Sequence, residues 1–112
     1  MASDDDPLLD RLGGARERLL SAIKMLAVSA QPLPERLEDA VMEVWQIAPG
    51  PLPKEIQVKL EYILARASSI EDDRDGNRFA ATLAVISEDE CVAIAEEIFA
   101  LYNLVMEKSG YE

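Results

Sequence analysis

The sequence predicts an all-α protein, a compact bundle of about five helices with a Pro-initiated helical hairpin in the middle. Apolar residues recur at three- and four-residue steps along most of the chain, and proline or capping residues mark several helix starts. Hydrophobic residues make up 49% of the chain and charged residues 29%, which is typical of a globular protein. Since 112 residues can enclose one core but not two, we expect a single domain over residues 1–112, with residues 1–6 as a flexible acidic tail.

The first helix is predicted to begin at Asp6-Pro7. Aspartate can accept the free amide groups of a helix start, and proline suits the first helical position. Gly13 and Gly14 interrupt the apolar pattern at a cost of roughly 1 kcal/mol each, which predicts a break, a close backbone approach or, as we favour, a weak first turn. The apolar stripe of this helix comprises Leu8, Leu12, Ala15, Leu19, Ile23, Leu26 and Ala30.

The middle of the chain contains two similar segments, offset by 19 residues. Pro32-Leu33-Pro34 opens a segment that ends at Trp45, and Pro51-Leu52-Pro53 opens one that ends at Leu64. Two copies are too few for a solenoid, so we expect a helical hairpin joined by a turn at Pro49-Gly50-Pro51. The aligned apolar positions, all expected to be buried, are Leu37 with Ile56, Val41 with Leu60, Val44 with Ile63, and Trp45 with Leu64.

Two further helices are predicted in the C-terminal part, after a polar segment at residues 68–77. Phe79, Leu83 and Ile86 have helical spacing, and Ser87-Glu88-Asp89-Glu90 fits a capping box that starts the last helix. Residues 91–106 include 13 hydrophobic residues in 16, too few for a membrane span of ~20 residues. This wide apolar face predicts a central place in the bundle or a homodimer interface. Its stripe is Ile94, Ile98, Tyr102 and Val105, widened by Phe99, Leu101 and Met106.

The chain contains no histidine, which excludes Ser-His, Cys-His and His-metal sites. We therefore expect no enzyme activity, no catalytic residues, no cofactor and no metal. Paired carboxylates could still hold a divalent cation, with Glu43 and Glu61, or Glu96 and Glu107, as the candidates. Their positions on predicted polar faces favour solvated charges instead.

The acidic segment at residues 71–76 resembles part of a calcium-binding EF-hand loop. Arg78 and Thr82 occupy the positions where that loop needs an apolar residue and a bidentate glutamate, so we interpret the segment as a turn. Cys91 lies in the first turn of the last helix, but the acidic residues before it disfavour a reactive thiolate. We expect Cys91 and Trp45 to be core residues, with Trp45 an interface anchor only if it is exposed.

The net charge of −11 is the strongest functional indication. Residues 71–112 carry 11 acidic and 3 basic side chains, against 11 and 8 in residues 1–70. This balance argues against nucleic acid and favours a basic protein partner. We therefore predict a non-enzymatic interaction, inhibitory or assembly module in the cytoplasm, with no membrane segment. The alternatives are a homo-oligomeric structural subunit that associates through the C-terminal helix, and a carboxylate-based metal-binding protein.

Overall fold

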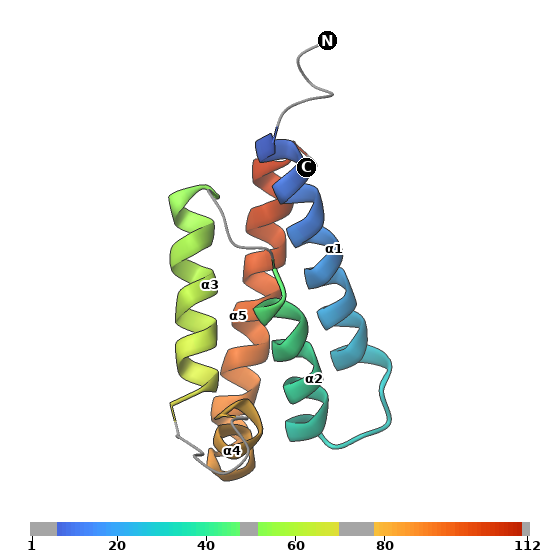
Figure 1. The fold of residues 1–112 in the computed structure, drawn as a ribbon. Helices are drawn as coiled ribbons and strands as arrows, with labels where there is room; N and C mark the ends of the chain where they lie inside the picture. The colour runs from blue at the N-terminus through green and yellow to red at the C-terminus, as the bar shows by residue number, and fades with distance from the viewer. Residues whose placement is uncertain (1–6, 48–51, 70–77, 111–112) are drawn as a thin grey trace.

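The computed structural model describes residues 7–47, 52–69 and 78–110, and these residues form helices without any strand (Figure 1). The all-α prediction is confirmed. The helices are α1 (Pro7–Val28), α2 (Leu33–Trp45), α3 (Lys54–Ala67), α4 (Arg78–Val85) and α5 (Glu88–Lys108). The predicted tail at residues 1–6 lies outside the described residues.

Helix α5 lies at the centre of the bundle and contacts α1, α2 and α3 (Figure 1). Helix α2 packs chiefly against α1, and α3 packs chiefly against α5. The short helix α4 packs mainly on α2. The core comprises Leu12, Ala15, Leu19, Ala22, Leu37, Ala40, Val41, Val44, Ile47, Ile56, Ile63, Ala67, Leu83, Cys91, Ile94, Ile98, Leu101 and Val105.

Helix α1 begins at Pro7, as predicted, and continues through Gly13 and Gly14 without a break. A Cβ atom built on either glycine meets no neighbouring atom within 4 Å, so no backbone approaches closely. The expected weak turn is therefore wrong, because a single unfavourable pair does not end a helix whose other residues pack against the core. Asp6 lies outside the described residues.

The predicted stripe of α1 is largely correct. Leu12, Ala15 and Leu19 are buried, and Ile23 and Leu26 are half-buried against the core. Ala30 is exposed beyond the end of the helix, and the side chain of Leu8 is outside the described part.

Replacing Gly13 or Gly14 with alanine is expected to raise the free energy of unfolding by roughly 0.5–1 kcal/mol each, because alanine restricts the unfolded chain and meets no obstacle here. Thermal unfolding followed by circular dichroism should show a higher Tm for Gly13→Ala and Gly14→Ala. Gly110→Ala is the control, because Gly110 has φ +87° and alanine there is strained. A lower Tm for either helical variant would contradict the uninterrupted helix.

The two Pro-initiated helices are present and contact each other, as the predicted hairpin requires, but that contact is not the main one that either helix makes. Each pairs mainly with a different neighbour, α2 with α1 and α3 with α5. The proposed turn at residues 49–51 lies outside the described residues. Most aligned positions are buried or half-buried as expected, for example Leu37 with Ile56 and Val44 with Ile63.

The prediction that Trp45 is a core residue is wrong, because its side chain is 57% exposed. Trp45 is the last residue of α2 and lies at the edge of the face that buries Val41 and Val44. Its ring instead meets that of Phe79 edge to face, with centroids 6.3 Å apart.

Helix α5 begins where the capping signal predicts. The Ser87 Oγ accepts a hydrogen bond from the Glu90 amide at 3.1 Å. The reciprocal half of the box is absent, because the Glu90 carboxylate pairs with Arg66 on α3. Along the described ranges, no helix combines the length and apolar character required to cross a bilayer.

Candidate functional site

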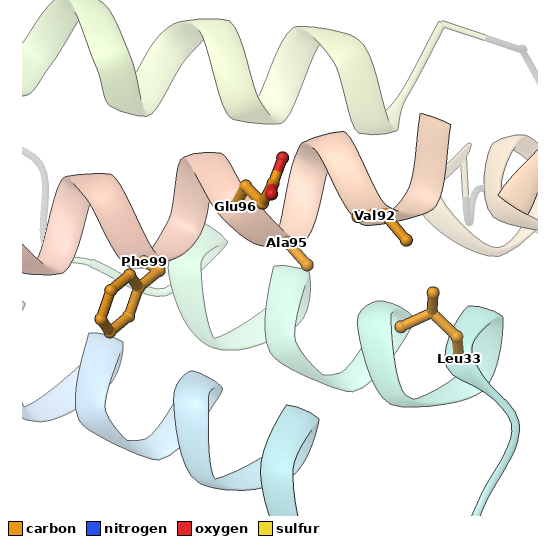
Figure 2. A pocket seen from close by; sticks show the side chains of 5 residues that line it. All are labelled: Leu33, Val92, Ala95, Glu96 and Phe99. Atoms are coloured by element: carbon orange, nitrogen blue, oxygen red, sulfur yellow. The ribbon is translucent and has the colours of Figure 1, made fainter. Parts of the chain in front are cut away.

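An apolar groove of about 480 Å³ lies between the start of α2 and one face of α5 (Figure 2). We call it the α5 groove. On α5, its residues recur at three- and four-residue steps and therefore share one face of the helix. The lining residues are Leu33, Val92, Ala95, Glu96 and Phe99.

The side chains of the α5 groove leave an apolar surface exposed to solvent. Leu33 points from α2 toward α5, while Val92 and Ala95 point back toward α2, and the Phe99 ring lies on the side of α1 (Figure 2). Val92 is 41% exposed and Phe99 is 55% exposed. Both adjoin fully buried residues of the same helix, so a rigid core supports this apolar surface.

The rim of the α5 groove is acidic. The Glu96 side chain is exposed and points away from Leu33 toward α3 (Figure 2). Glu88 and Asp89, one turn before Val92, are also exposed. Over the part of the chain that the structure describes, none of these three carboxylates takes part in an ion pair.

Other carboxylates of α5 and α3 are already engaged within the bundle. Lys59 of α3 pairs with Glu97 at 3.2 Å, and Lys108 pairs with Glu55 at 2.7 Å. Glu55 also raises the pKa of Lys108 by hydrogen bonding and by its charge, and the pKa of Arg66 is raised in the same way by Glu90. These ion pairs join α3 to α5, and solvent screens them because they are exposed.

The carboxylate pairs considered as metal ligands are not assembled into a site. Glu43 pairs with Arg18 at 3.1 Å, and Glu61 accepts a hydrogen bond from Gln57 at 3.4 Å. Glu96 and Glu107 are separated by three turns of one helix, roughly 16 Å. Among the described residues, no three side chains of metal-binding type lie together. The acidic segment at residues 71–76 lies outside the described residues.

Cys91 is buried at the start of α5, in agreement with its prediction as a core residue. Burial raises the pKa of its thiol, and the negative charges of Glu88 and Glu90 raise it further. The neutral thiol is therefore the stable form near neutral pH, and it acts as a small apolar side chain.

Two other cavities are smaller and more polar. One of about 100 Å³ lies between α3 and α5 and contains Arg66, Glu96 and Glu97. The other, of about 290 Å³, lies along α1 beside Asp10 and Arg18. Arg66 and Arg18, which line these two cavities, already pair with Glu90 and Glu43.

The α5 groove was not identified from the sequence, although Phe99 was recognised as widening the apolar face. The sequence does contain a pattern that indicates the groove. A second apolar stripe lies next to the buried one on the last helix, at Val92, Ala95 and Phe99. No protein-family model matches this chain, and neither does any curated protein or solved structure. The class that the fold and the site define is an acidic helical bundle with an exposed apolar groove.

Proposed function

We propose that this protein is a non-enzymatic protein-protein interaction module that binds a basic partner protein through α5. The observation that carries the proposal is the α5 groove. Its apolar side chains are exposed, and the carboxylates beside it have no ion-pair partner among the described residues. Apolar patches with a polar rim are typical of protein-binding surfaces.

The charge of the chain supports a basic partner. A net charge of −11 attracts a basic surface and accelerates encounter with it, while repelling nucleic acid. The single cysteine is buried and needs no oxidising compartment, which supports a module that acts in the cytoplasm.

A homo-oligomeric subunit is the second candidate, and the exposed Val92 and Phe99 on α5 favour it. Most of the apolar face that suggested a dimer is already used inside the bundle, including Ile94, Ile98 and Leu101. A chain that stays monomeric at high micromolar concentration in analytical ultracentrifugation would exclude this candidate.

The basic-partner proposal predicts a salt-sensitive complex. Immobilised protein should retain one or a few basic proteins from lysate of the source cells at ~50 mM NaCl and lose them at ~300 mM, because salt screens exposed charges. Mass spectrometry identifies what is bound. Retention that does not change with salt, or no retention at either concentration, would contradict the proposal.

A further inference from the structure

We infer that the partner presents a basic amphipathic α-helix, which lies along the α5 groove with its apolar face against Val92 and Phe99. This inference rests on the proposed function and specifies the segment that the site would bind. It follows from the shape of the groove, from the charges beside it and from the occupants that those charges disfavour.

The shape of the groove suits a helix. Val92 and Phe99 are seven residues apart on α5, which corresponds to about 10 Å along the helix axis. A partner helix exposes apolar residues at the same spacing, at positions i, i+3 or i+4, and i+7. Leu33 forms the opposite wall, and the small Ala95 between the two larger side chains leaves room for an inserted residue.

The negative charges beside the groove favour an occupant that carries cations. None of the five lining residues is basic, and Glu96 stands at the rim. Lys59 and Arg66, the cations of α3 that reach α5, are paired with Glu97 and Glu90. Lysine or arginine flanking the apolar face of a bound helix would therefore meet Glu96, Glu88 and Asp89 without displacing an existing ion pair of the described residues.

The same charges disfavour other occupants. A second copy docked groove to groove across a two-fold axis would place two Glu96 carboxylates in one interface without a basic lining residue. The parts of this chain outside the described residues contain seven acidic residues besides Glu112 and a single arginine, so they lack the required cations. An anionic membrane surface would be repelled by the acidic rim.

The test is an NMR titration of the isotope-labelled full chain with two synthetic peptides at ~50 mM NaCl. Both contain the same leucines and lysines and are about five helical turns long. One has its leucines at i, i+3, i+4 and i+7 positions, and the other has them scrambled. The amphipathic peptide should bind at least ~10-fold more tightly, with the largest amide shifts at Leu33 and over residues 92–99.

Matched variants localise the binding. Phe99→Ala should weaken binding of the amphipathic peptide by ~10-fold, whereas Val58→Ala, at an α3 position that is likewise 55% exposed, should change it less than ~2-fold. Glu96→Lys should weaken binding by ~5-fold or more, whereas Glu61→Lys changes the net charge equally and should have a much smaller effect. All four positions are on the helix surface, and circular dichroism checks that each variant is folded.

The outcomes separate the inference from the proposed function. Equal binding of both peptides, or shifts centred away from the α5 groove, would overturn the inference while leaving a basic partner in place. If neither peptide binds even at low salt, the inference fails, and the salt-dependent retention of basic proteins decides the basic-partner proposal separately. Binding that Phe99→Ala and Val58→Ala weaken equally would also overturn the groove as the docking site.

Discussion

Ile98→Ala is expected to lower the free energy of unfolding by about 3 kcal/mol, whereas Phe99→Ala at the next position should cost at most about 1 kcal/mol. Ile98 is completely buried between α5 and its neighbours, so its truncation leaves a cavity in the core. Phe99 is 55% exposed, and much of its ring remains in water in the folded protein. Urea unfolding followed by far-UV circular dichroism measures both values.

This pair of variants tests the assignment of the two faces of α5. The two substitutions are adjacent on one helix and both end in alanine, so the helix propensity of the product is the same. Similar losses of stability would mean that Phe99 packs inside the bundle and that the α5 groove is filled in solution. A loss of ~3 kcal/mol is a large part of the 5–15 kcal/mol that stabilises a small domain, so the measurement is decisive.

The helix starts could be predicted because their signals are local. Pro7, the prolines before α2 and α3, and the Ser87 hydroxyl act on the residues that directly follow them. Amphipathic spacing then identified most buried positions, since a stripe at helical period must face something apolar. Helix-start residues and amphipathic spacing can both be read without knowing how the helices pack against one another.

The neighbours of each helix could not be predicted in the same way. Nothing in the two Pro-initiated segments indicates that α2 packs on α1 and α3 on α5. The side of α5 that remains uncovered follows from that arrangement, so the exposure of Phe99 was not predictable although its apolar character was. Glu90 likewise fitted a local capping role but pairs with Arg66, which is 24 residues away.

The connection between α1 and α2 contains a further contact that the amphipathic spacing does not indicate. Arg36 of α2 donates from Nε to the Gln31 carbonyl oxygen at 2.8 Å and from Nη1 to the Leu26 carbonyl oxygen at 2.6 Å. Leu26 lies in the last turn of α1, where carbonyl groups have no partner within the helix. That turn contains no basic residue of its own, so Arg36 supplies both the hydrogen bond and the positive charge that favours a helix C-terminus.

Arg36→Ala is therefore expected to reduce the free energy of unfolding by about 2 kcal/mol, because two charge-assisted hydrogen bonds are lost and a half-buried carbonyl is left without its partner. Arg36→Lys keeps the charge but replaces the planar guanidinium with a single amine, and should lose about 1 kcal/mol. Arg18→Ala is the matched control, because it removes an exposed arginine whose ion pair with Glu43 is worth less than about 1 kcal/mol. If urea unfolding gives equal losses for Arg36→Ala and Arg18→Ala, the guanidinium of Arg36 does not hold the two helices together.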